Sequence, residues 1–271
     1  MAKESLSETI GLLYLYNLYS VDQVRTVSDT KRKFYAHHTR PINSVYRRVV
    51  EELMVEMHLL SVNVNFRYDP IYALGVVTSF DRFMRGYRPE QDLSSIFNAL
   101  CQAVQGDPQT YRQDAENLKN SVQGLSIEQI SSWNSSLASQ GSASNLYERF
   151  KEIAFNDSFK YSRLFAIGLY SLLEQIDAEV VNDEKQRNSI LQELCESLKL
   201  STDKVQKDLD LYRSNLEKMD QVQAVLEDAL QAERKRKQKR ALEKQPATPT
   251  EEPAPEASGE EDSSSEDTPS S

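Results

Sequence analysis

The sequence has little cysteine and no apolar run long enough to cross a bilayer. Its two cysteines, Cys101 and Cys195, fall at helical spacing from aliphatic neighbours, which predicts buried structural thiols and fits a reducing, intracellular compartment. The uncharged run that is richest in aliphatic and aromatic residues, residues 9–21, has only 13 residues, and the longest uncharged run, residues 129–147, is rich in serine. A membrane-spanning helix needs roughly 20. If the protein works at a membrane, we therefore expect it to be peripheral.

The sequence also lacks the common catalytic motifs. It contains no HExxH, no glycine-rich phosphate-binding loop, no GxSxG and no CxxC. Histidine occurs three times, and the adjacent pair His37 and His38 would need metal ligands from elsewhere in the chain. We therefore predict a non-enzymatic protein with no catalytic, cofactor-binding or metal-binding residues.

One stretch, SVYRRVVEELMVEMHLL at residues 44–60, combines three glutamates with a histidine and so imitates a metal site of a helical bundle. Such sites place Glu and His at i, i+3 on one helix. Here Glu51 and His58 are seven positions apart, or about 10 Å along a helix axis. Glu56 and His58 are two positions apart and point to different sides. The spacing argues against one ion bound by this stretch.

The glutamates of this stretch are instead expected to form ion pairs on a solvated face. Arg47 and Arg48 precede Glu51 and Glu52 by four positions, which places each carboxylate one turn from a guanidinium. The apolar residues between them follow the three–four spacing of a single buried stripe. The first alternative function is that of a carboxylate-metal enzyme of a helical bundle.

Proline, aspartate and glycine divide the chain into a series of helices with short connections. Apolar three–four spacing recurs between these residues, as in the expected helix 157–178, where Gly168 predicts a close helix–helix approach. The serine-rich residues 125–147 are expected to form a loop or short helix that lets Trp133 dock. With no alternating strand pattern present, we predict an all-α helical bundle. Expected helix starts are Pro41, Pro70, Pro89 and Pro108, with Asp69 and Asp107 as N-caps, and expected ends are Gly86, Gly106, Gly124 and Gly141.

A heptad repeat begins after Ser201 and predicts a long C-terminal helix. One of its eight seam positions, Gln223, is polar, so the seam is nearly complete. We favour a projecting, coiled-coil-like helix, with a seam packed inside the bundle as the alternative. The two series of the repeat are Val205, Tyr212, Met219, Leu226 and Leu209, Leu216, Gln223, Leu230.

Charge is unevenly distributed toward the C-terminus. Residues 234–244 include seven basic residues and one glutamate, whereas residues 245–271 carry eight acidic and no basic residues. The acidic segment consists largely of Pro, Glu, Ser and Thr, with almost nothing to bury, which predicts disorder.

The basic run RKRKQKR, residues 234–240, has three interpretations. It is a solvated helix end, a contact with anionic lipid headgroups at on the order of 1 kcal/mol per charge, or a nucleic-acid-binding segment. Nucleic-acid binding would call for interleaved aromatics or a recognised fold, and neither is present. We expect no nucleic-acid partner, and a basic-helix nucleic-acid binder is the second alternative function. Lipid contact would involve Arg234, Lys235, Arg236, Lys237, Lys239 and Arg240.

Three long strings resemble the thylakoid formation protein family, a photosystem II biogenesis factor of cyanobacteria and plastids. They are VRTVSDTKRKFYAHHTRPINSVYRRVVEELMVEMHLLSVNV, YDPIYALGVVTSFDRFMRGY and SIFNALCQAVQGDPQTYRQDAE. The resemblance implies an all-helical, non-enzymatic protein with a coiled-coil C-terminal part. It also implies a peripheral location on the cytoplasmic face of the thylakoid membrane, a cyanobacterial source, and a role in photosystem II assembly and repair. The implied partners are the thylakoid FtsH proteases and the photosystem II assembly and repair machinery.

The expected organisation has four parts. Residues 1–23 form an N-terminal extension, 24–200 the helical bundle, 201–244 the long heptad helix with its basic end, and 245–271 the disordered acidic tail. Family members usually begin within a few residues of the element RTVSDTKR, whereas about twenty residues precede it in this sequence. We therefore expect a mis-set translation start, with synthesis beginning at Val21, or else a loosely packed arm.

Overall fold

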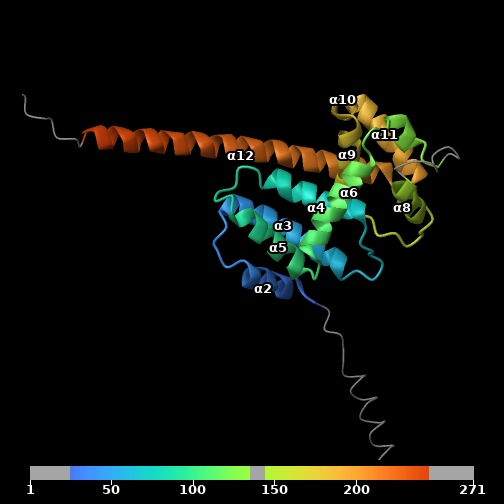
Figure 1. Cartoon of the computed structure of the whole chain (residues 1–271), viewed down its shortest axis with the longest axis horizontal. Helices are drawn as coiled ribbons and strands as arrows, with labels where there is room; N and C mark the ends of the chain where they lie inside the picture. The colour runs from blue at the N-terminus through green and yellow to red at the C-terminus, as the bar shows by residue number, and fades with distance from the viewer. Residues whose placement is uncertain (1–24, 135–143, 244–271) are drawn as a thin grey trace, which may run out of the picture. The chain divides into compact units, whose positions relative to one another are not determined.

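The protein is all-helical over the residues that the structure, a computed structural model, describes, namely 25–134 and 144–243 (Figure 1). The predicted fold class is confirmed, whereas the extension 1–23, the tail 245–271 and the predicted helix end at Gly141 lie outside the described residues. The helices are α2 (Val27–His37), α3 (Ser44–Ser61), α4 (Pro70–Phe83), α5 (Asp92–Ala103), α6 (Pro108–Ser121), α7 (Ile127–Ser131), α8 (Ser144–Ala154), α9 (Arg163–Ile176), α10 (Ala178–Asn182), α11 (Glu184–Ser197) and α12 (Thr202–Glu243).

The two aspartates predicted as N-caps do cap helices. The Asp69 carboxylate accepts hydrogen bonds from the backbone N–H groups of Ile71 and Tyr72 at 2.8 and 2.9 Å, at the start of α4. The Asp107 carboxylate accepts from the backbone N–H of Thr110 at 2.9 Å, at the start of α6. In both helices proline fills the first helical position, where no N–H is needed.

The predicted helix starts at Pro41 and Pro89 are wrong. Helix α3 begins at Ser44 behind the cap Asn43, and α5 begins at Asp92. Both prolines lie in the preceding connections, where their fixed φ is equally acceptable.

Helices α4 and α9 pack with their backbones in direct contact. A methyl group on Gly75 would lie 1.7 Å from the carbonyl oxygen of Leu164, and one on Gly168 would lie 1.9 Å from that of Ile71. No side chain fits at either position, so glycine is required on both helices. The close approach predicted at Gly168 is confirmed, and Gly75 supplies its counterpart.

The first half of α12 packs into the bundle. A compact unit of the chain ends at Gln223, and residues from Ala224 onward belong to a second unit. Within the first unit the seam residues Val205, Leu209, Tyr212 and Met219 are 1, 2, 2 and 7% exposed. For this stretch the intramolecular seam is confirmed and the projecting arm is wrong.

Three side chains expected to be buried are buried. Cys101 and Cys195 are free thiols with no exposed surface, and burial raises the pKa of Cys101 to about 12 and that of Cys195 to about 11. Trp133 packs edge-on against Phe150, and its Nε1 donates a hydrogen bond to Ser197 Oγ at 2.8 Å. The thiols are therefore structural, and the indole anchors the segment after α7.

Candidate interaction groove

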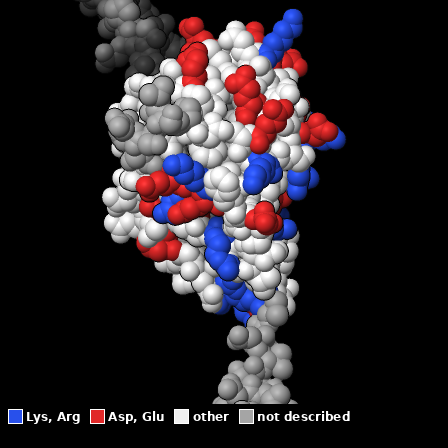
Figure 2. Space-filling view, turned by 90° about the vertical axis from the view of Figure 1, so that its right-hand side faces the viewer, with Lys and Arg blue, Asp and Glu red and all other residues white. Residues whose placement is uncertain are grey.

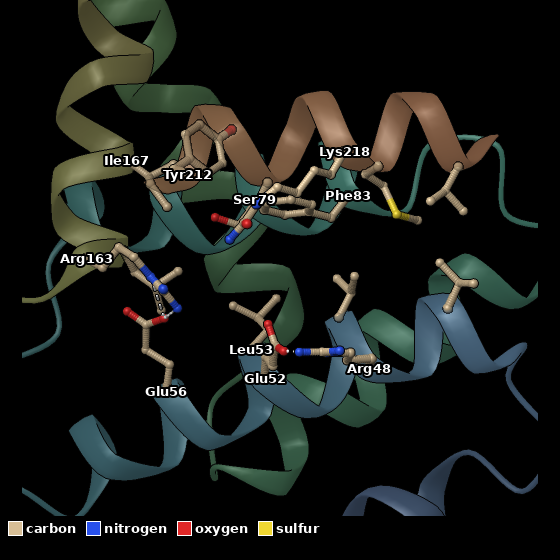
Figure 3. Close-up of a pocket in the computed structure, with 16 residues that line it drawn as sticks. Arg48, Glu52, Leu53, Glu56, Ser79, Phe83, Arg163, Ile167, Tyr212 and Lys218 are labelled. Carbon is tan, nitrogen blue, oxygen red and sulfur yellow. Dashed lines mark hydrogen bonds and ion pairs between the residues drawn. The ribbon is translucent and has the colours of Figure 1, made fainter. Parts of the chain in front are cut away.

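A groove with a cavity volume of about 420 Å³ runs between α3 and the first half of α12 (Figure 3). Ligand sites typically enclose roughly 300–1,000 Å³. Helix α3 contributes one complete face, with residues at i, i+3, i+4, i+7, i+8 and i+11, and α4 and α9 form the floor. The lining residues on the two walls are Val45, Arg48, Val49, Glu52, Leu53 and Glu56 of α3 and Tyr212, Asn215, Lys218, Met219 and Val222 of α12.

The groove has an apolar floor. Ile167 of the floor is buried, as are Leu53 and Met219 at the base of the two walls, and Val222 at the margin remains 37% exposed. The hydroxyl of Ser79, also on the floor, is buried without a hydrogen-bond partner among the described residues. A concave, mostly apolar lining with a few polar groups is typical of a site that receives another molecule.

Two ion pairs form the rim of the groove on the α3 side, and Figure 3 shows both. The guanidinium of Arg163, the first residue of α9, donates to Glu56 Oε2 from Nη2 at 2.6 Å and from Nε at 3.2 Å. Arg48 Nε donates to Glu52 Oε1 at 2.9 Å. The first pair joins α9 to α3 and fixes the position of that wall.

A second hollow lies on the other side of this rim. It shares Arg48, Glu52, Glu56 and Arg163 with the groove and carries two exposed apolar side chains of α3, Val55 (37% exposed) and Leu59 (57%). The ion-paired rim therefore separates two hollows that both present apolar surface.

One predicted ion pair of α3 is confirmed and the other is wrong. Arg48 pairs with Glu52 as expected. Glu51 pairs instead with Lys31 of α2 at 3.0 Å and accepts a hydrogen bond from Tyr35 Oη at 3.0 Å. The hydrogen bond from Lys31 is the main reason that the pKa of Glu51 lies below its usual value. A neighbouring helix thus displaces the local partner, Arg47.

The histidine of this stretch points away from the glutamates. His58 is buried, and its Nδ1 shares a hydrogen bond with Thr30 Oγ1 of α2 at 2.8 Å. Burial lowers the pKa of His58. Across residues 25–134 and 144–243, no three His, Cys, Asp or Glu side chains come close enough together to hold a metal ion.

A partly buried polar contact links α12 to α4 and α9 beside the groove. Arg82 of α4 donates to both carboxylate oxygens of Glu174 on α9, at 2.6 and 3.3 Å. Its Nη1 also lies 3.5 Å from the hydroxyl of Tyr212 on α12. Burial raises the pKa of Tyr212 to about 12, so the phenol stays protonated at neutral pH. The two floor helices, α4 and α9, and the α12 wall are thereby joined.

The basic run lies on the second half of α12, away from the residues of the groove in the sequence. All of its side chains are exposed, and Lys237 pairs with Glu233 of the preceding turn at 2.8 Å. The residues expected to contact lipid are thus solvent-accessible: Arg234, Lys235, Arg236, Lys237, Lys239 and Arg240. None of the described helices is both long and apolar enough to traverse a bilayer.

Acidic and basic side chains are interspersed on the face of the protein shown in Figure 2. Charges of alternating sign largely cancel beyond a Debye length, about 8 Å at physiological ionic strength. On such a surface, recognition of a charged partner depends on local pairs rather than on a long-range field.

Sequence reasoning did not find the groove. Arg163 and Lys218 lie far from the α3 stretch in the sequence, and neither belongs to a motif. The one available signal was the face of α3 itself, where two arginines followed by three glutamates border the apolar stripe.

Comparisons with known proteins give one consistent result. A sequence profile described as thylakoid formation protein matches residues 26–241. Protein Thf1 of Rippkaea orientalis is 57% identical over 235 residues, which cover 86% of this chain and 100% of that protein. Protein Thf1 of Crocosphaera subtropica is 59% identical over 226 residues, or 83% and 92% of the two chains. A solved structure of Psb29 superposes with a TM-score of 0.69 at 47% identity and covers 79% of this chain and 98% of that one.

Proposed function

Because the chain belongs to the thylakoid formation protein family, we propose that it is a non-enzymatic, peripheral protein of the cytoplasmic face of the thylakoid membrane. In this proposal it acts in photosystem II assembly and repair by binding and stabilising thylakoid FtsH protease complexes. The family is named for thylakoid formation, which is no enzyme class, and the Thf1 proteins of Rippkaea orientalis and Crocosphaera subtropica are cyanobacterial.

The observation that carries the proposal is the groove between α3 and α12. The groove combines an apolar floor, an exposed apolar residue at its margin, Val222, and a rim fixed by ion pairs, and the adjoining hollow adds the exposed side chains of Val55 and Leu59. Helical proteins often bind an amphipathic helix of a partner, which places its apolar side chains into a groove of this kind. A binding role requires no catalytic group, and the groove presents no nucleophile paired with a base.

Affinity purification from native thylakoids tests the proposal. The full chain, tagged at its C-terminus and expressed at its native level in a cyanobacterium, is recovered from detergent-solubilised membranes. We expect FtsH subunits in the bound fraction, and a strain that lacks the protein should accumulate fewer FtsH complexes and recover photosystem II more slowly after photodamage. Normal FtsH levels and normal recovery in the deletion strain would contradict the proposal.

We further propose that the basic run of α12 contacts anionic lipid. Six exposed cations lie within two turns of a helix, and each contributes on the order of 1 kcal/mol near an anionic surface. Flotation with phosphatidylglycerol vesicles should recover the full chain at low salt, and phosphatidylcholine vesicles should not. Replacement of all six residues by glutamine should abolish flotation, whereas unchanged recovery would rule out this contact.

A further inference from the structure

We propose that the groove and the adjoining hollow on α3 together bind an acidic amphipathic helix of a protein partner. The inference deepens the proposed binding function and rests on it for the biological partner. It concerns the chemistry of the segment that docks, which follows from the charges and apolar side chains that the two hollows leave unmatched.

Every carboxylate in the two hollows already has a cation. Glu51 pairs with Lys31 at 3.0 Å, Glu52 with Arg48 at 2.9 Å and Glu56 with Arg163 at 2.6 Å. A basic ligand therefore finds no unpaired acidic group among the described residues that line either hollow. A basic segment would have to displace the protein's own cations from these glutamates in order to bind them.

Each hollow also presents one cation without an ion pair among the described residues. Lys218 lies in the groove and Arg47 in the second hollow, and both side chains are exposed. The positions one helical turn from Lys218 are Ser214, Asn215, Gln221 and Val222, so its own helix supplies no acid. A ligand that matches both hollows therefore carries acidic groups on two sides.

The apolar surface defines the rest of the ligand. The floor of the groove requires large apolar side chains, and Val55 and Leu59 extend this requirement across the rim. The α3 wall from Val45 to Glu56 is about 16 Å long at 1.5 Å per residue, or about three turns of a docked helix. A helix with an apolar stripe flanked by carboxylates satisfies both requirements.

The acidic tail of this chain does not meet them. Residues 245–271 supply eight carboxylates but contain no Leu, Ile, Val, Met or aromatic residue. The tail therefore offers charge without an apolar anchor. A separate protein segment that carries both is the occupant that fits.

Two labelled helical peptides of matched design test the charge preference. One carries leucines at i, i+4 and i+7 with glutamates on both flanks, and the other has lysine in place of each glutamate. Fluorescence anisotropy with the full chain should show at least tenfold tighter binding of the acidic peptide. The double variant Arg47→Glu, Lys218→Glu should reverse the preference, and the control Lys185→Glu, an exposed lysine on α11, should leave it unchanged. Circular dichroism and thermal melts confirm that each variant is folded.

Several results would overturn the inference. One is equal affinity for the two peptides, and another is an unaltered preference in the double variant. A third is tighter binding of submicellar lysophosphatidylglycerol than of the acidic peptide, with displacement of the peptide. The occupant would then be a lipid. Undiminished FtsH recovery from thylakoids with the double variant would likewise place the partner elsewhere and leave the proposed function intact. If the wild type recovers no FtsH but retains the Lys218-dependent peptide preference, the proposed function fails and the inference stands.

Discussion

The two halves of α12 share one helix and one heptad repeat, yet they differ in what their apolar residues contact. From Thr202 to Gln223 four of the six seam residues are buried in the first unit, among them Leu209, which is 2% exposed. From Ala224 to Glu243, in the second unit, the seam residue Leu230 is 53% exposed, and Val225, next to the seam, is 67% exposed. A repeat thus identifies which face of a helix is apolar, but not whether the chain itself covers that face.

The largest expected effect separates the two halves directly. Leu209→Ala should lower the free energy of unfolding by about 2–5 kcal/mol, because it leaves a cavity in a packed core. Leu230→Ala, the matched truncation in the exposed half, should change it by less than about 0.5 kcal/mol. Urea denaturation followed by circular dichroism measures both. Equal losses would mean that the second half is as firmly packed as the first.

A smaller effect is expected from the polar anchor of the first half. Glu174→Gln removes the charge that Arg82 contacts at 2.6 Å and should cost about 1–3 kcal/mol, since it leaves a partly buried guanidinium poorly matched. The corresponding change in the second half, Glu233→Gln, removes an exposed pair and should have no measurable effect. Thermal melts of the two variants should therefore differ. A Glu174→Gln variant of unchanged stability would show that the Arg82–Glu174 pair does not stabilise this part of the fold.

How much the sequence could predict depends on how local each determinant is. Asp69 and Asp107 cap helices through backbone groups two or three residues away, and both were predicted correctly. The partner of Glu51 was not, because Lys31 reaches it from another helix. The groove depends on four helices whose packing is fixed by contacts such as Gly75 against Leu164, 89 positions apart. No periodicity within one segment contains that information.

We expect the pH dependence of the free energy of unfolding to come from two histidines of the first unit. His58 and His38 are both buried there, and burial lowers the pKa of each below the value near 6.5 that it has in the unfolded chain. The unfolded state therefore binds protons first as the pH falls, so stability is lost from pH 6.5 downward through the folded pKa. Urea midpoints between pH 7.5 and 5.5 measure this slope. His58→Gln should flatten it, whereas an unchanged slope would assign it to other groups.

The smallest effect on stability is expected from changes to residues 245–271, which follow α12 in the sequence. Deletion of residues 245–271 should leave the melting temperature nearly unchanged, because that segment has no large apolar residue to bury. Binding to anionic vesicles at low salt should strengthen, since eight negative charges would no longer compete for the basic run. Vesicle flotation of the two proteins provides the comparison. Equal recovery would count against a lipid contact through residues 234–240.

The glycine contact between α4 and α9 has a consequence for the rate and cost of binding. With Gly75 and Gly168 each seated against the opposite backbone, the two floor helices cannot slide or separate without losing close contact along their length. A partner that enters the groove therefore meets a preorganised surface and need not supply the free energy to order it, so most of its contact energy appears as affinity. Association should resemble rigid-body docking, with differences among partners expressed mainly in how slowly they leave.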